Sequence, residues 1–255
     1  MQQLTIIKIG GKVLDDQDQL DAVLADFSAI RGRKILVHGG GKKASRLCEQ
    51  LGIQPRMHAG RRITDAATLE VAVMTYAGVL NKQVVGRLQG LSCNAFGLSG
   101  VDGQAIVANK RPVGLVDYGF AGDVEWINEK LIAGLMELDV VPVFCAISAD
   151  RSGQLLNTNA DTIATLLAIA LTQQYAVTLK FCFEKAGVLA DPDDETSVLA
   201  TLNSEEYTAS TKAGNIYEGM IPKLDNAFAA KNAGVERVLV CGLDGILVDA
   251  GTKID

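Results

Sequence analysis

"KILVHGGGK", residues 34–42, places three consecutive glycines directly after a short apolar run. The run Ile35–Val37 predicts a strand, and Ala44–Leu51 predicts a helix. Three ordered glycines cost more backbone entropy than other residues, so a connection built from them is expected to serve a purpose. In open α/β sheets, ligands bind beyond the carboxyl ends of the strands. The stretch therefore predicts an α/β fold with a binding loop at that edge.

A second glycine loop has the same position relative to its strand. Leu4–Ile9 predicts a strand that stops at Gly10-Gly11, with Lys8 near its end. Glycine backbones can turn N–H groups toward an anion, and a following helix start adds partial positive charge. Tight strand-to-helix turns alone would also explain the glycines. The patterns GxxxxGK[ST] and GxGxxG are absent, so the loops indicate an anion site without identifying the anion.

Strands and helices alternate along the rest of the chain. This order predicts a mostly parallel sheet covered by helices on both faces, with turn-rich small strands or a hairpin between Gln104 and Trp126. Further helices are expected at Asp18–Ile30, from Thr64 onward, and at Glu129–Leu138, Ala160–Leu171 and Lys223–Asn232; further strands at Val140–Ala146, Ala176–Cys182, Arg237–Cys241 and Ile246–Val248.

Composition excludes several classes of function. The 255 residues carry a net charge of −6, which argues against nucleic acid or an anionic membrane as the main partner. Five scattered cysteines without a CxxC pair indicate reduced thiols, and only two histidines are present to support a thiol enzyme or a metal site. No signal peptide or membrane span is recognisable, so a cytoplasmic protein is expected. Since histidine-rich metal patterns such as HExxH are absent, no metal ligands are predicted.

Two polar segments stand out among apolar elements. In "LLNTNAD", residues 155–161, an N-cap at Asn159 with Asp161 in the first helical turn is the simpler interpretation, but it leaves Asn157 unexplained. In "GMIPK", residues 219–223, Lys223 lies at a helix start, where the helix dipole disfavours a cation. A surface lysine is the common alternative, whereas an incoming phosphate would explain the position.

Taken together, the motifs resemble the acetylglutamate kinases of the amino-acid kinase family. The matching stretches, in order, are "KIGG" (8–11), "VHGGGK" (37–42), "GRRIT" (60–64), "LLNTNAD" (155–161) and "GMIPK" (219–223). The resemblance implies an αβα sandwich around a mostly parallel central sheet. It further implies an acyl-amino-acid-binding and dimerisation lobe at 1–175 and an ATP-binding lobe at 176–255. The implied assembly is a homodimer.

The resemblance also implies roles for individual residues. Lys8 and Lys223 resemble the two lysines that stabilise the transferring phosphoryl group, and Asp161 resembles the aspartate that holds them. Gly11 matches a glycine whose N–H faces that group. On the substrate side the implied residues are Gly40, Gly41, Arg62, Asn157 and Asn159, with the Arg62 fork suited to an α-carboxylate.

The nucleotide side departs from the family pattern. The implied cofactor-binding residues are Gly10, Glu184, Gly187, Asn215 and Tyr217. An "SDVxG"-like turn is expected there, but "CFEKAGVL" has Glu184 and Lys185 in place of Asp-Val. The chain also starts at its first strand, without the extra N-terminal helix of arginine-inhibited hexameric members, which favours a dimer.

The implied reaction is phosphorylation of the γ-carboxylate of N-acetyl-L-glutamate by ATP, with Mg²⁺ carried on the nucleotide, as the second step of arginine biosynthesis. N-Succinyl-L-glutamate stays open as the substrate, as do the aspartate, glutamate, carbamate and UMP kinases of the same family. An inactive amino-acid-binding sensor would be expected to lose Lys8, Asp161 or Lys223, all of which are present.

Overall fold

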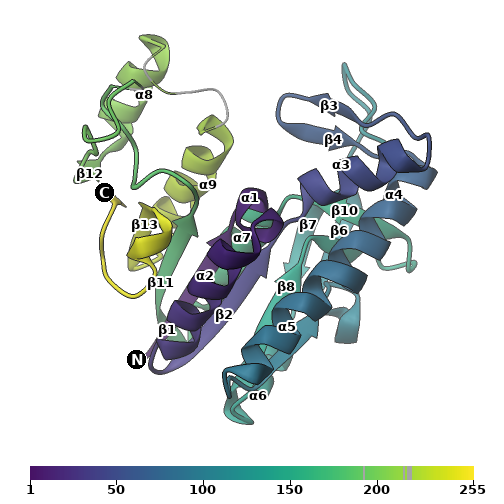
Figure 1. Ribbon diagram of the computed structural model, residues 1–255, viewed down its shortest axis with the longest axis horizontal. Helices are drawn as coiled ribbons and strands as arrows, with labels where there is room; N and C mark the ends of the chain where they lie inside the picture. The colour runs from purple at the N-terminus through teal and green to yellow at the C-terminus, as the bar shows by residue number, and fades with distance from the viewer. Residues whose placement is uncertain (192, 215, 217–219) are drawn as a thin grey trace.

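The computed structural model describes residues 1–191, 193–214, 216 and 220–255, and a twisted sheet forms its centre (Figure 1). The strands follow the order β12-β14-β13-β11-β1-β2-β8-β5. Neighbours from β13 to β5 run parallel, whereas β14 is antiparallel to β13. The bounds are β1 Gln2–Ile9, β2 Arg33–His38, β5 Ala95–Leu98, β8 Val141–Cys145, β11 Tyr175–Cys182, β12 Thr201–Leu202, β13 Arg237–Cys241 and β14 Thr252–Ile254.

Helices cover the sheet to give the expected αβα sandwich, because each buries one apolar stripe against the strands. In α2, for example, the buried residues are Leu20, Val23, Leu24 and Phe27. The helices are α1 Gly11–Asp15, α2 Gln17–Ala29, α3 Gly41–Gln50, α4 Ala66–Val73, α5 Asn81–Gly90, α6 Glu129–Glu137, α7 Ala160–Leu171, α8 Ser204–Lys212 and α9 Ile221–Asn232. A π-helical segment, Met74–Leu80, joins α4 to α5 as one long helical run.

Strict alternation of strands and helices does not hold in two places. The strands β6 Ile106–Lys110, β7 Ala121–Ile127, β9 Ile147–Ala149 and β10 Leu155–Thr158 close on themselves as a small barrel. A separate hairpin, β3 Arg56–His58 and β4 Arg61–Ile63, stands above α3 in Figure 1. The hairpin expected between Gln104 and Trp126 is confirmed as the antiparallel β6–β7 pair.

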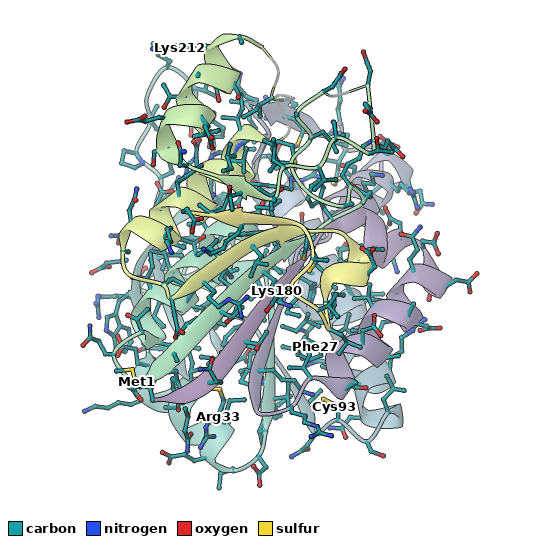
Figure 2. All side chains as sticks on the ribbon, turned by 90° about the vertical axis from the view of Figure 1, so that its left-hand side faces the viewer. Met1, Phe27, Arg33, Cys93, Lys180 and Lys212 are labelled. Atoms are coloured by element: carbon teal, nitrogen blue, oxygen red, sulfur yellow. The ribbon has the colours of Figure 1, made fainter. Side chains whose placement is uncertain are left out.

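The predicted strand at Ile246–Val248 is wrong. These residues form a turn, and the last strand is β14. The buried ammonium of Lys180 on β11 accounts for the turn: its Nζ donates to the carbonyl oxygens of Gly245, Ile246 and Val248 at 3.0–3.1 Å. Figure 2 shows Lys180 on the sheet beside this yellow C-terminal segment. Three carbonyls that converge on one ammonium cannot point alternately to opposite sides, as successive carbonyls of a strand do.

Candidate active site

The two glycine loops lie side by side at the carboxyl edge of the sheet. β1 and β2 pair in parallel with Ile9 opposite His38, so both strands end together. A Cβ added to Gly11 would lie 4.0 Å from the backbone nitrogen of Gly41. No side chain caps the start of α1 or α3, which leaves N–H groups of both helix starts for an anion.

A buried ion pair adjoins these loops. Lys8 Nζ lies 2.7 Å from a carboxylate oxygen of Asp161, and both side chains are about nine-tenths buried. Asp161 is in the first turn of α7, where Asn159 Oδ1 accepts from the backbone N–H groups of Asp161 and Thr162 at 2.7 and 3.1 Å. The N-cap interpretation of Asn159 is therefore confirmed, and its side-chain NH₂ is the part left for a ligand. The pair fixes the direction of the Lys8 ammonium.

Arg62 is buried at the base of the β3–β4 hairpin with one half of its guanidinium held. Its Nη2 donates to the Gly41 carbonyl at 2.7 Å and to Ser45 Oγ at 2.8 Å. Its Nη1 is buried and makes no hydrogen bond within the described residues. A buried charged donor without a partner is costly, so this nitrogen is poised for an anionic ligand.

Arg62 and the loop Gly39–Gly41 line a cavity of about 180 Å³, and the Lys8–Asp161 pair adjoins its wall at Asn159 and Ala160. Its wall includes all five predicted substrate residues, Gly40, Gly41, Arg62, Asn157 and Asn159. Asn157 Nδ2 donates to Thr64 Oγ1 at 3.0 Å. No aspartate or glutamate lines it. The lining residues are Gly39, Gly40, Gly41, Met57, Gly60, Arg61, Arg62, Tyr76, Arg111, Ala121, Gly122, Ala146, Asn157, Thr158, Asn159 and Ala160.

Lys223 lies in the first turn of α9, as predicted. α9 packs against α7, with Thr165 Oγ1 donating to the Asn226 carbonyl at 3.3 Å. The hairpin reaches the same helix start, because a Cβ added to Gly60 would lie 3.9 Å from Cγ of Pro222. The element that carries Lys223 therefore contacts both the helix of Asp161 and the hairpin of Arg62.

Three of the predicted nucleotide residues, Gly10, Glu184 and Gly187, follow the ends of β1 and β11. The Gly10 N–H donates to the Cys182 carbonyl at 3.2 Å, and the exposed Glu184 comes two residues later. Gly187 has a packing role, since an added Cβ would lie 2.6 Å from Val198 Cγ1. Asn215 and Tyr217 lie outside the described residues. For the cofactor side, these assignments stay predictions.

Sequence reasoning missed several residues of the cavity. Arg61 and Arg111 line it, and Ser45 holds Arg62. Arg61 is part of the motif "GRRIT", so the sequence contains a signal for it, but the resemblance implies a role only for its neighbour Arg62. Arg111 forms an ion pair with Asp123 across the β6–β7 pair, and no local motif announces that position.

His38 ends β2 and is completely buried. Its Nδ1 lies 2.8 Å from the Gly39 carbonyl, which can only accept, so Nδ1 carries the proton. Burial lowers the pKa of His38 from 6.5 to about 4, only partly opposed by this hydrogen bond. The imidazole is therefore neutral at physiological pH.

This burial predicts acid sensitivity of the fold. The unfolded chain binds a proton at His38 below about pH 6.5, whereas the folded chain resists protonation down to about pH 4. Stability is fully present above pH 6.5 and falls with pH between these values, by about 2 kcal/mol at pH 5. We expect urea unfolding between pH 7.5 and 5.0 to show this loss in the wild type and not in His38→Gln. Equal pH dependence in both would contradict the prediction.

Arg62→Ala is expected to raise KM for the acylated amino acid about a hundredfold, since charge-assisted hydrogen bonds contribute about 1.5–3 kcal/mol. KM for ATP should change less than threefold, and kcat less than tenfold. Arg62→Lys keeps the charge but loses the two-pronged guanidinium, so its KM for the acylated amino acid should lie between those of the wild type and Arg62→Ala. Steady-state kinetics with each substrate varied would measure this. A change confined to KM for ATP would exclude the assigned role.

The loops, the buried ammonium and the held guanidinium define a site for moving a phosphoryl group onto an anionic acceptor. Residues 3–242 match the amino acid kinase family, and the chain belongs to that family. The chain is accordingly a kinase that uses ATP as its phosphoryl donor.

Relatives named acetylglutamate kinase align over nearly the whole chain. The protein from Phocaeicola vulgatus is 49% identical over 99% of this chain and 98% of its own length. The protein from Methanopyrus kandleri is 37% identical over 98% of this chain and all of its own length.

Solved structures share the fold at lower identity. The N-acetylglutamate synthase from Neisseria gonorrhoeae, complexed with coenzyme A and N-acetyl-glutamate, has a TM-score of 0.81 at 22% identity, covering 98% of this chain and 59% of its own. Carbamate kinase from Giardia lamblia bound to AMP-PNP has a TM-score of 0.71 at 16% identity, covering 98% and 97% of the two chains.

Two features are absent from the described residues. None of their helices is long and apolar enough to cross a membrane. Within the same residues, no group of three or more His, Cys, Asp or Glu side chains could hold a metal ion.

Proposed function

We propose that this protein transfers the γ-phosphoryl group of ATP to the γ-carboxylate of N-acetyl-L-glutamate, the second step of arginine biosynthesis. One observation carries the proposal: the half-free Arg62 guanidinium and the loop Gly39–Gly41 line one cavity, and the Lys8–Asp161 pair adjoins its wall at Asn159 and Ala160. The names of relatives at 44–49% identity support the substrate.

The chemistry needs positioning and fixed positive charge more than covalent help. Arg62 Nη1 binds the α-carboxylate, which directs the γ-carboxylate toward Lys8 and the glycine loops. A γ-carboxylate oxygen attacks the γ-phosphorus, the bond to the β,γ-bridging oxygen breaks, and ADP leaves. Lys8, the Gly11 N–H and Lys223 stabilise the equatorial oxygens. Because the attacking carboxylate is already ionised, no general base is required.

The nucleotide belongs to the segment 176–255 in this scheme, and the acylated amino acid to 1–175. Gly10, Glu184, Gly187, Asn215 and Tyr217 are the proposed nucleotide contacts. Mg²⁺ enters on the ATP phosphates, because it retains most of its waters and needs few protein ligands. A cytoplasmic location fits these substrates.

A homodimer is proposed through the β5 edge of the sheet and the long helical run beside it. Phe96 on β5 is 51% exposed, and Met74 and Val79 on the π-helical segment are 44% and 47% exposed. An edge strand flanked by exposed apolar side chains can pair with a second copy.

Trapping of the acyl phosphate with hydroxylamine tests the reaction. Wild-type protein with ATP and N-acetyl-L-glutamate should yield the hydroxamate, and omission of either substrate should not. Ligand binding without hydroxamate or ADP would support the inactive sensor and overturn the proposal.

N-Succinyl-L-glutamate is a second candidate, favoured by Arg61. Asp123 pairs with Arg111, whereas the Arg61 guanidinium makes no hydrogen bond or ion pair with a described residue. Asp123 acts on Arg61 only as a more distant charge that raises its pKa. Burial and then the charge of Arg111 lower the pKa of Arg61, a sign of unfavourable confinement. Since Arg62 suffices for the α-carboxylate, Arg61 is available for a carboxylate on the acyl group.

Comparison of the two acyl substrates tests this candidate. If the acyl group is succinyl, Arg61→Gln should lower kcat/KM for N-succinyl-L-glutamate by about tenfold or more, the weight of one charged hydrogen bond. The value for N-acetyl-L-glutamate should stay within threefold. Wild-type preference for the acetyl compound, with both values unchanged in Arg61→Gln, would remove the candidate.

A further inference from the structure

His38, in the motif "VHGGGK", neither binds nor catalyses in the proposed function, yet it adjoins the cavity wall. It is completely buried, and Gly39 and Gly40, the next two residues, line the cavity. The protonated Nδ1 donates to the Gly39 carbonyl at 2.8 Å. The hydrogen bond therefore acts on the peptide that joins the two glycines.

The direction of the Gly40 N–H follows from the geometry of the Gly39–Gly40 peptide. In a trans peptide, the carbonyl and the N–H point in opposite directions, and no cis bond occurs in the described residues. Holding the Gly39 carbonyl toward the buried imidazole turns the Gly40 N–H away from it. That N–H makes no hydrogen bond within the described part of the chain. It is thus an available donor at the cavity wall.

The imidazole is itself fixed from its other side. Asn81 Nδ2 donates to His38 Nε2 at 3.1 Å and to the Val143 carbonyl at 2.9 Å. Asn81 is 1% exposed and packs against β5, where a Cβ on Gly97 would lie 2.0 Å from its Oδ1. The ring cannot rotate without breaking both bonds, so the hydrogen on Nδ1 is fixed in place.

The Gly40 carbonyl accepts from the Ala44 N–H at 3.1 Å, but it belongs to the next peptide. Within the described residues, no hydrogen bond other than that of His38 holds the peptide that carries the Gly40 N–H. As a glycine it could adopt many backbone conformations, and the Cβ that would restrict it is excluded by Leu80 Cδ1 at 2.4 Å and Tyr76 Cδ1 at 2.7 Å. The loop must be glycine for space and therefore needs an external constraint. The chain Asn81–His38–Gly39 supplies it.

We infer that His38 is a positioning residue. Held by Asn81, it aims the Gly40 N–H at the γ-carboxylate of the acylated amino acid. The inference rests on the proposed function and deepens it. It assigns binding of the acceptor substrate, and not of the nucleotide, to this buried hydrogen-bond chain.

Two substitutions of His38 separate its hydrogen bond to Gly39 from its hydrogen bond to Asn81. His38→Asn places an amide NH₂ near Nδ1 and keeps the donor to Gly39, but loses the contact with Asn81. His38→Gln reaches Asn81 and loses the donor to Gly39. Steady-state kinetics should show kcat/KM for N-acetyl-L-glutamate reduced tenfold or more in His38→Gln, and within threefold of wild type in His38→Asn. KM for ATP should stay within threefold in both.

A purely structural role of His38 predicts a different ranking of the two variants by activity. Activity would then follow the free energy of unfolding, measured in urea, and both substrates would be affected alike; this result overturns the inference, as does full activity in His38→Gln. If His38→Gln does not fold, His38→Asn decides: near wild-type kcat/KM supports the role and a tenfold loss overturns it. Turnover by the wild type reports separately on the proposed function.

Discussion

Lys8→Met is expected to lower kcat by about a thousandfold or more, the weight typical of a positive charge on a transferring phosphoryl group. The ammonium is fixed 2.7 Å from Asp161 and stands next to the loop Gly10-Gly11. Charge that is preorganised before the reaction lowers the barrier without reorganisation. Single-turnover kinetics with saturating ATP and N-acetyl-L-glutamate would measure the chemical step.

Stability needs a control in this experiment. Removal of Lys8 leaves the Asp161 carboxylate buried without its partner, a loss of about 3–5 kcal/mol in comparable pairs. The double variant Lys8→Met with Asp161→Asn should regain stability but not activity. An effect of Lys8→Met on KM for ATP alone, with kcat preserved, would refute the assignment.

Lys180→Met should destabilise the fold by about 3 kcal/mol or more, because it leaves buried carbonyls without a donor. Lys180 is 4% exposed, and its Nζ binds three carbonyls of the turn before β14 as well as lying 3.5 Å from Asp249. For a chain of this size the midpoint of thermal unfolding should fall by roughly 6–12 °C. Calorimetry would check it.

Lys212→Met is the matched control. Lys212 is exposed near the end of α8, far from Lys180 in Figure 2. Substitutions at such positions change stability by about 0.5 kcal/mol or less. If both variants unfold at the same temperature, the carbonyl cluster does not stabilise the C-terminal turn.

Much of the sandwich could be predicted because its elements are long, apolar and bounded by clear signals. α7 and β13 have the predicted ends, and β1 and β2 extend the predicted strands by only one or two residues at an end. Buried parallel strands and capped amphipathic helices are where local pattern and tertiary packing agree.

The rest depends on contacts between distant segments. The small barrel joins β6, β7, β9 and β10 across some fifty residues of chain, and period-2 patterns do not specify such closure. The ion pair of Lys8 with Asp161 spans most of the chain and was reached by resemblance alone. Arg61 on β4 and Arg111 after β6 are fifty residues apart in the chain, and both line the cavity.

The pairing of β1 with β11 along eight residues has a mechanical consequence. The proposed acceptor and nucleotide segments meet at this seam, so one hydrogen-bonded ladder crosses the middle of the enzyme. Two bodies joined by such a ladder cannot swing on a flexible tether as separate jaws can. Any approach of the two substrates must instead come from flexing of the sheet or from displacement of the hairpin and α9 above it, and loss of either half should unravel the other.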